Sequence, residues 1–483
     1  MAEKRKSRDG HARKPAKGQP ATVEQAKEVP APFDAKAAAD KHNIWWLKGK
    51  DCYLRPDPSG REWVPESGKQ IARFLRLKGI SNEKFGRAYS QLDEIFQHVA
   101  DYKKVSFAQP LAGRKAGVHY LSEDLPIIVT NSFRMIEGVP GEWPLHGALA
   151  EALFVTAEAD QTRWSYAWLK IGRQSLRTGI WRPAPWMFLS GPPNCGKSLW
   201  QSIYTALLGG IGREADPLPW LLGAEKSNAD LVGAEHLKIS EMEGRFKHEE
   251  RSNLAQRMKK VAVERFHRWR GMYNDGFSVP VIWRASASVN ENVDDLKKLP
   301  SLSGGFADKA MLLSCEKRPL PMPTETTDDW LAFEQALAKE RPAFAYYLDH
   351  EFEIPPEMRR TDAAGRYGFD VFHHPRPLAL LFSQERESGL LHILDNCDDL
   401  YTPTTKFPGG VWGPKASEEL KRLLCEDDEF ERFRQLARST LDFPGACGTF
   451  LARLEEKYPN RIQGSRVGGK GNHVWMILPP PEE

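Results

Sequence analysis

The sequence has no long hydrophobic run, and none of its apolar stretches approaches the roughly 18 residues of a membrane-spanning helix. Its N-terminus is basic from the start and carries no apolar segment of the kind that marks a secretory signal. Its six cysteines are scattered and include no C-x-x-C pair, which argues against a zinc site and a disulfide framework. We therefore expect a cytoplasmic protein with reduced thiols and no membrane partner.

The composition shows no strong charge bias, since the net charge is +3, and 41% hydrophobic and 28% charged residues are ordinary for a globular protein. A chain of 483 residues is too long for one hydrophobic core, so about two to four domains are expected. Residues 1–38 differ, because they are rich in Ala, Pro, Lys and Arg and have too little apolar surface to fold. This predicted disordered basic tail is either a solubilising segment or an arm that binds phosphates.

The stretch from Trp186 to Leu208 carries the strongest chemical signal. An apolar run that predicts a buried strand is followed by the turn GPPNCGKS and a segment with helical spacing. The turn fits G-x-x-x-x-G-K-[ST], in which glycines let backbone N–H groups point at phosphate oxygens. Lys197 can reach the β- and γ-phosphates of a nucleotide, and the Ser198 hydroxyl can bind Mg²⁺. The residues predicted to bind ATP are Gly191, Pro192, Pro193, Asn194, Cys195, Gly196, Lys197, Ser198 and Leu199.

A second candidate element lies at Ala234–Gly244, where a short apolar strand leads into acidic residues. Glu241 and Glu243 are alternate residues, so both would face the same side of an extended strand. One carboxylate would hold the Mg²⁺ shell, which we assign to Glu241 with Ser198, and a second would polarise the attacking water. Either Glu243 or Glu241 is the candidate base. Further along, IWRASASVN predicts a strand ending in Asn290, whose amide is suited to orient that water.

Residues Arg257–Asn290 predict a helix and then a β-hairpin, because Asn-Asp-Gly at 274–276 is a strong turn signal. The first arm of the hairpin alternates basic and aromatic residues, as a surface that follows a nucleic-acid backbone and stacks bases would. Its candidate DNA-binding residues are Arg265, His267, Arg268 and Arg270. A solvated arm or a contact between subunits is the alternative interpretation.

The last segment, residues 411–483, predicts three helices and a two-stranded wing around the glycines at 468–469, which is typical of a winged helix. Its third helix and wing supply cations suited to phosphate contacts. The candidate DNA-binding residues are Arg453, Lys457, Arg466 and Lys470. Small winged helices also serve as protein-interaction modules, and this alternative stays open.

Taken in order, the GPPNCGKS turn, the acidic strand end, the cationic hairpin arm and the strand ending in Asn290 resemble superfamily 3 helicases, which are AAA+-like ATPases. The likeness covers roughly Thr162 to Pro323 and is nearest to the primase–helicase type of phages, satellites and other mobile elements, although no primase centre is evident. It implies a ring, commonly a hexamer, that uses ATP and Mg²⁺ to move on DNA. Single-stranded or duplex DNA, further copies of the chain and a separate primase are the partners that it suggests.

The resemblance also implies roles for individual residues. Lys197 and Ser198 would hold the phosphates and Mg²⁺, Glu241 and Glu243 would be the Walker B acids, and Asn290 would be the first sensor. The family places an arginine finger beyond the sensor, where this chain offers Arg318 or Lys309. Arg318 completes the set of candidate catalytic residues. Lys309 is an open alternative, although lysine lacks the bidentate fork of arginine, and an altered activation between subunits is another.

We expect an α/β fold with a P-loop AAA+-like ATPase core, an α+β N-terminal domain and a C-terminal winged-helix domain. The predicted boundaries are 1–38 for the tail, 39–160 for the N-terminal domain, 161–348 for the ATPase domain, 349–410 for a connecting segment and 411–483 for the winged-helix-like domain. The expected function is that of an ATP-dependent DNA helicase or translocase in the replication of a mobile element, in the bacterial or host cytoplasm. The alternatives are an ATP-switched DNA-binding initiator, loading or defence factor without strand displacement, and a small-molecule P-loop phosphotransferase.

Overall fold

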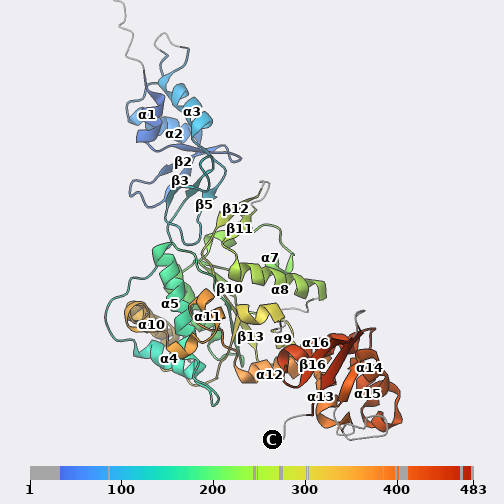
Figure 1. Cartoon of the computed structure of the whole chain (residues 1–483). Helices are drawn as coiled ribbons and strands as arrows, with labels where there is room; N and C mark the ends of the chain where they lie inside the picture. Colours follow the sequence, from blue (N-terminus) through green and yellow to red (C-terminus); the bar gives the residue numbers. More distant parts are fainter. Residues whose placement is uncertain are drawn as a thin grey trace, which may run out of the picture. The chain divides into compact units, whose positions relative to one another are not determined.

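A computed structural model describes residues 33–84, 88–242, 246, 248–270, 276–300, 302, 304–383, 386–397, 400–401, 412–467 and 472–479. Glu243, Lys470, residues 1–32 of the predicted tail and residues 274–275 of the predicted hairpin turn lie outside this set. The chain divides into two compact units, one of residues 1–55 and 65–104 and the other of residues 56–64 and 105–483. Figure 1 follows the elements along the chain.

The first unit contains the helices α1 (Ala35–Lys41), α2 (Gly68–Leu77) and α3 (Gln91–Tyr102). A sheet in the order β3-β2-β1-β4 is formed by β1 (Trp45–Leu47), β2 (Cys52–Pro56), β3 (Trp63–Glu66) and β4 (Lys104–Val105). The hydrophobic core of the first unit includes Ile71 and Leu75 of α2 and Ile95 of α3. The prediction of a disordered tail to residue 38 extends too far, because α1 already begins at Ala35, where Asp34 accepts a capping hydrogen bond from the Ala37 N–H.

A parallel sheet in the order β14-β8-β13-β10-β9 forms the centre of the second unit. Its strands are β8 (Trp186–Gly191), β9 (Glu214–Ala215), β10 (His236–Ile239), β13 (Arg284–Asn290) and β14 (Ala310–Ser314). Every residue of β8 is buried, as expected for a parallel strand covered on both faces. The protein therefore has a mixed α/β fold, and the buried strand expected before the Gly-rich turn is confirmed.

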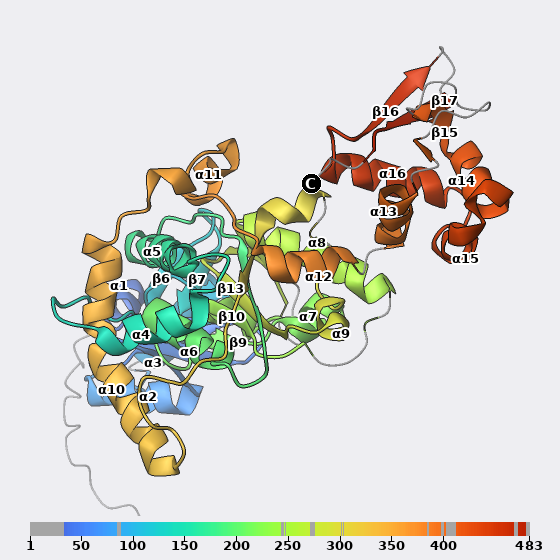
Figure 2. The ribbon, with the colours of Figure 1, turned by 90° about the horizontal axis from the view of Figure 1, so that it is seen from below.

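Alternate residues of β8 face two different hydrophobic clusters. Met187 and Leu189 pack with residues of α4 (Pro144–Phe154), α5 (Thr162–Thr178) and α6 (Lys197–Leu208). Trp186 and Phe188 pack on the other face with residues of α8 (His248–Val263). Figure 2 shows this layering, with α4 and α5 on one side of β10 and β13 and α8 on the other. The helix α10 (Thr327–Tyr346) packs on α4.

Shorter elements complete this part of the second unit. They are β5 (Ala108–Gln109), β6 (Gly117–Tyr120), β7 (Pro126–Val129), α7 (Leu218–Leu222), β11 (Phe266–Trp269), β12 (Phe277–Pro280), α9 (Val293–Leu296) and α11 (Asp362–Tyr367). The strands β5, β7 and β6 form a small sheet, and β11 and β12 form an antiparallel pair.

The second unit contains an ion pair between two fully buried side chains. The Arg173 guanidinium of α5 contacts the Asp349 carboxylate at 2.7 Å, and neither side chain is exposed to solvent. Arg173 also donates hydrogen bonds to the carbonyl oxygens of Leu207 and Ile136, and Arg177 is a second partner of Asp349. The pair therefore joins α5 to the segment that follows α10.

The C-terminal part begins with α12 (Pro375–Ser383) and α13 (Arg386–Asn396) and continues with α14 (Ser417–Glu426), α15 (Glu431–Thr440) and α16 (Ala446–Lys457). An antiparallel sheet in the order β15-β17-β16 comprises β15 (Trp412–Ala416), β16 (Ile462–Val467) and β17 (Asn472–Ile477). The helices α13 to α16 and this sheet share one core. The sequence predicted only two strands here, because β15 carries Pro414 and few of the residues that favour strands.

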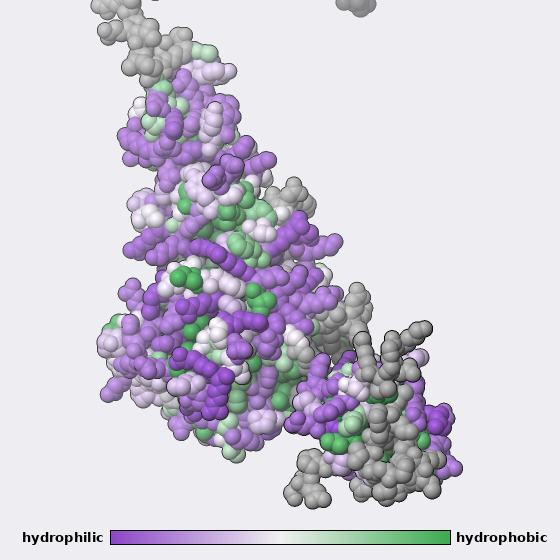
Figure 3. Space-filling view, viewed as in Figure 1, coloured by the Kyte–Doolittle hydropathy of each residue, from purple (hydrophilic) through white to green (hydrophobic). Residues whose placement is uncertain are grey.

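Among the described residues, no helix is long and apolar enough to cross a membrane. On the face shown in Figure 3, hydrophilic residues cover most of the surface and hydrophobic residues are scattered among them.

Candidate functional site

Three neighbouring strands of the parallel sheet bring polar groups to one edge. The Gly-rich loop follows β8, Asn290 ends β13, and Glu241 comes two residues after β10. Because parallel strands end at the same edge, these groups line a common cavity of about 870 Å³. The cavity also reaches Trp330 and Leu337 of α10. Its location outside the carboxyl ends of the strands is where open α/β sheets bind ligands.

The loop between Gly191 and Ser198 has the backbone geometry that its glycines permit. Gly196 has φ of +104° at the N-cap of α6, and Asn194 has φ of +58°. Lys197 begins α6 and is buried. Its ammonium group donates hydrogen bonds to the carbonyl oxygens of Gly191 at 2.8 Å and Pro192 at 2.7 Å. A positive charge and the amino end of a helix therefore meet at the cavity wall, which suits an anion.

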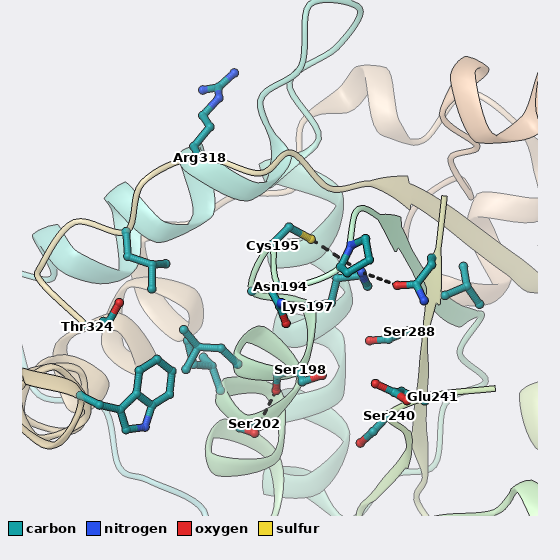
Figure 4. A pocket seen from close by; sticks show the side chains of 18 of the residues that line it. Asn194, Cys195, Lys197, Ser198, Ser202, Ser240, Glu241, Ser288, Arg318 and Thr324 are labelled. Atoms are coloured by element: carbon teal, nitrogen blue, oxygen red, sulfur yellow. Dashed lines mark hydrogen bonds between the residues drawn. The ribbon is translucent and has the colours of Figure 1, made fainter. Parts of the chain in front are cut away.

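Ser198 and Glu241 are both exposed and line the cavity. Figure 4 shows Glu241 and Arg318 on opposite sides of Lys197. A hydroxyl and a carboxylate are the oxygen donors that Mg²⁺ uses when phosphates and waters complete its shell, so the residues present fit this ion. The strand β10 ends at Ile239, so Glu241 lies two residues beyond it, and the predicted orientation of Glu241 and Glu243 toward the same side stays a prediction. Glu243 itself lies outside the described residues.

Asn290 is held by a chain of polar contacts that no motif in the sequence marks. Its side-chain oxygen lies 3.4 Å from the Lys197 ammonium, and its amide donates to Asp295 at 3.1 Å. Asp295 in turn pairs with Lys298 at 2.5 Å. Burial alone raises the pKa of Asp295, but hydrogen bonds from Lys298, Asn292 and Asn290 outweigh it and lower that pKa. Asp295 therefore stays ionised and fixes the orientation of the Asn290 amide.

The two candidate finger residues differ in position. Arg318 is exposed at the cavity, donates a hydrogen bond to the Val155 carbonyl at 2.7 Å, and directs its guanidinium away from Lys197 (Figure 4). Lys309 pairs with Asp308 at 2.6 Å and precedes β14, so it lies at the opposite edge of the parallel sheet from the loop. Of the two, only Arg318 lines the cavity.

Arg376, in the first turn of α12, is a further cation at the carboxyl ends of the parallel strands, where the Gly-rich loop lies. It contacts Glu291 at 2.6 Å, Glu316 at 2.8 Å and the Ser314 hydroxyl at 2.7 Å. These partners follow or end β13 and β14, so Arg376 joins the carboxyl ends of two strands. No motif or spacing in the sequence marks this contact.

Alternation along β11 separates the candidate DNA-binding residues of the hairpin. Arg265, Arg268 and Arg270 are exposed together with Phe266, whereas Trp269 is buried. His267 is also buried: it packs on the Trp283 ring and contacts the Glu264 carbonyl at 3.0 Å. Burial lowers the pKa of His267 to about 4, so the ring is neutral at pH 7. The assignment of His267 to a DNA-binding surface is therefore corrected, since it points into the core.

The C-terminal candidates are distributed differently. Arg453 and Lys457 of α16 lie 3.2 and 3.4 Å from the buried Glu387 carboxylate of α13. Both cations are thus partly neutralised within their own domain, although half of the Arg453 side chain is exposed. Arg466 lies on β16, but its side chain is outside the described set, as is Lys470 altogether.

A protein-based metal cluster has no support within the described part of the chain, where no group of three or more His, Cys, Asp or Glu residues could hold an ion. The adjacent His373 and His374, for example, bind protein groups rather than forming part of a metal site. His373 contacts the Ala310 carbonyl at 2.8 Å, and the buried His374 contacts the Thr156 hydroxyl at 2.9 Å. Both serve the packing of the second unit.

Fold and site together define an α/β protein with a phosphate-suited loop at the carboxyl edge of a parallel sheet. No protein-family model and no curated protein matches the chain. Among solved structures, the chain is similar to the A-form apo structure of the NrS-1 C-terminal region, with a TM-score of 0.51 and 11% identity over 92% of this chain and 98% of that chain. A second apo structure of the same region has a TM-score of 0.51 and 10% identity over the same shares. At such identity the likeness shows a shared fold.

Proposed function

We propose that this protein is an ATP- and Mg²⁺-dependent DNA helicase or translocase of superfamily 3 type that acts in the replication of a mobile element. The observation that carries the proposal is the convergence of Lys197, Asn290 and Glu241 on one cavity beside the Gly-rich loop. The order of motifs along the chain supports an AAA+-like core, and the parallel sheet with the Gly-rich loop at the end of β8 agrees with it.

In this proposal, the phosphates of ATP lie against the loop and the first turn of α6. Lys197 exchanges its carbonyl partners for the β- and γ-phosphates. Ser198 and Glu241 would hold Mg²⁺, and the ion would neutralise charge on the phosphate oxygens. Asn290, fixed by Asp295, orients the attacking water. Glu243 or Glu241 accepts the proton of that water, and Lys197 stabilises the charge that develops on the leaving phosphate.

The exposed Arg318 fits a role across a subunit boundary better than Lys309 does. Its guanidinium contacts a neutral carbonyl and points away from the Gly-rich loop of its own chain, so it is free of a charged partner among the described residues and could contact a neighbouring copy. Lys309 is already paired with Asp308 at the far edge of the sheet. A hexameric ring, as the family resemblance implies, would bring Arg318 of one copy to the nucleotide of the next.

The C-terminal part is proposed to be a winged-helix domain that contacts duplex DNA. The helices α14 to α16 and the sheet β15-β17-β16 supply the elements of such a domain. Because Glu387 already pairs with Arg453 and Lys457, these two cations would have to exchange a carboxylate for a phosphate. Their contribution to DNA affinity is therefore expected to be smaller than that of unpaired cations.

The hairpin is tested by the double variant Arg268→Gln/Arg270→Gln. Because both side chains are exposed and flank buried residues that hold the strand, the variant should fold and keep its basal ATP turnover. Stimulation of turnover by single-stranded DNA should fall at least about fivefold, since each lost phosphate contact weakens binding. Phosphate release with and without single-stranded DNA, read beside strand displacement, is the measurement.

The matched control is Lys339→Gln/Arg360→Gln, which removes two exposed cations away from the hairpin. Undiminished stimulation in the hairpin variant would remove β11 from the mechanism. If the unmodified protein hydrolyses ATP but displaces no strand, the alternative of an ATP-switched DNA-binding factor is preferred. If it neither binds nor splits ATP, the proposed function fails.

Asp295→Asn tests whether Asp295 holds the Asn290 amide in the orientation proposed to position the attacking water. The variant keeps the shape of the side chain but removes the charge that pairs with Lys298 and fixes Asn290. We expect kcat for ATP to fall roughly ten- to hundredfold, as is typical when a residue that orients a reactive group is lost. ATP affinity should change little, because Lys197 and the loop stay intact. Asp308→Asn at the opposite edge is the control, and equal kcat in both variants would contradict the role of Asp295.

A further inference from the structure

The Gly-rich loop contains a thiol with a second thiol beside it. Cys195 is buried in the protein but lines the cavity, and Cys315 is fully buried directly after β14. The two residues belong to the same buried cluster, although they are 120 residues apart in the sequence. Sheet pairing explains the approach: β14 lies next to β8, and the Cys315 N–H donates to the Ser190 carbonyl at 2.6 Å.

The same cysteine supports the start of the loop. A side-chain carbon built at Gly191 would lie 2.5 Å from the Cys315 carbonyl oxygen and 2.9 Å from the Cys315 Cβ atom. Only glycine fits at 191 for this reason, so the loop backbone rests directly on residue 315. A change of bonding at Cys315 should therefore shift the backbone at the start of the loop.

The Cys195 sulfur also lies beside the phosphate-binding lysine, with the Lys197 ammonium 3.7 Å from Sγ. The hydrogen bond from the Cys315 thiol and the positive charge of Lys197 together lower the pKa of Cys195, against the opposing effect of burial. By contrast, burial raises the pKa of Cys447 to about 12 and also raises that of Cys425. Thiolate character makes a cysteine the nucleophile in oxidation, so Cys195 is the more reactive of these thiols.

We infer that Cys195 and Cys315 form a modification site at which hydrogen peroxide closes an intramolecular disulfide across the Gly-rich loop. The Cys195 thiolate attacks one peroxide oxygen, the O–O bond breaks, and a sulfenic acid and hydroxide form. The Cys315 thiol then attacks the sulfenic sulfur, the S–S bond forms, and water leaves with the thiol proton. The pair loses two electrons, and the peroxide gains them.

The consequence for nucleotide binding rests on the proposed function. A disulfide would draw the loop toward β14 and remove the negative charge from the Cys195 sulfur beside the Lys197 ammonium, so the lysine assigned to the phosphates would shift. A nucleotide in the cavity would in turn cover Cys195 and slow its oxidation, because Cys195 is reached from the cavity. Peroxide and nucleotide would thus exclude each other at this loop.

The test uses the full-length protein, reduced and then treated with hydrogen peroxide. Peptide mass analysis should find Cys195 linked to Cys315, and a thiol reductant should reverse the link. ATP affinity should fall roughly ten- to hundredfold in the oxidised form, the expected effect of losing a charged hydrogen bond to phosphate. ATP present during treatment should slow formation of the link.

Cys315→Ala is the informative variant, because alanine keeps the carbonyl oxygen and the Cβ atom against which Gly191 packs, so the reduced variant should still bind ATP. It should form no link and should leave a Cys195 sulfenic acid that dimedone traps, formed more slowly than in the unmodified protein because the Cys315 thiol no longer lowers the pKa of Cys195. Cys447→Ala, a buried cysteine in another core, is the control and should behave as the unmodified protein does. Absence of the 195–315 link while Cys52 or Cys425 is oxidised would overturn the inference, and so would a link that leaves ATP affinity unchanged. If the reduced protein binds no ATP, the proposed function fails, whereas the linked peptide still decides whether the thiol pair exists.

Discussion

Lys197→Ala is expected to reduce ATP turnover by at least about a hundredfold, the usual effect of removing a group that stabilises charge in a transition state. ATP binding should weaken roughly tenfold or more, because one charged hydrogen bond to phosphate is lost. Lys197 is suited to this role because it begins α6 and its ammonium, now bound to two loop carbonyls, lies 3.4 Å from Asn290. Phosphate release and calorimetric titration with ATP measure the two effects separately.

Lys339→Ala serves as the control for this variant, since Lys339 is exposed on α10 and is not among the residues that line the cavity. Thermal unfolding should show that both variants are folded, because the two hydrogen bonds lost with Lys197 go to the last carbonyl of β8 and to the loop, and the pairing of β8 with β13 and β14 is unchanged. Turnover within about threefold of the unmodified protein would mean that phosphates bind elsewhere, with a loss of only about 0.6 kcal/mol of transition-state stabilisation.

Asp349→Asn is expected to lower the free energy of unfolding of the second unit by about 3–5 kcal/mol. The substitution keeps the shape of the side chain but leaves the buried Arg173 guanidinium without its counter-charge. Removing one partner of such a pair costs much more than the pair contributes in total, because the remaining charge stays desolvated. Urea unfolding followed by circular dichroism is the measurement, and Glu351→Gln, an exposed neighbour, should change stability by less than about 0.5 kcal/mol.

The unmodified protein and Asp349→Asn should also differ in how their stability depends on pH in the acid range. Burial opposes ionisation of Asp349, but Arg173 and Arg177 outweigh it, so the pKa of this carboxyl is lower in the folded protein than in the unfolded chain. Its contribution to stability is therefore complete above the unfolded pKa of about 4 and is lost as pH falls toward the folded value. The unmodified protein should lose more stability than Asp349→Asn between about pH 5 and pH 3. Parallel pH profiles would contradict this assignment.

Local patterns in the sequence were sufficient to predict the elements around the loop. The apolar run before Gly191 is the strand β8, and the segment with helical spacing after the turn is α6. Both succeed because hydrophobic periodicity and turn residues act over a few neighbouring positions. The end of the predicted tail was less accurate, since composition alone did not mark Asp34 as the cap of α1.

Contacts between distant segments could not be predicted in the same way. Asp295 and Arg376 support the candidate site through partners on other elements, and Asp349 lies far along the chain from Arg173. The burial of His267 is an intermediate case. Alternation along β11 predicts that it faces opposite to Arg268, but only the Trp283 ring shows which of the two faces is covered.

Arg376 has a mechanical consequence for the edge of the sheet. One guanidinium joins Glu291 after β13, Ser314 and Glu316 at the end of β14, and the first turn of α12. A displacement of the strand end that carries Asn290 must either break a charged hydrogen bond or move α12 with it. The amide beside the phosphate loop is thus coupled to the helix that leads into the C-terminal part of the chain.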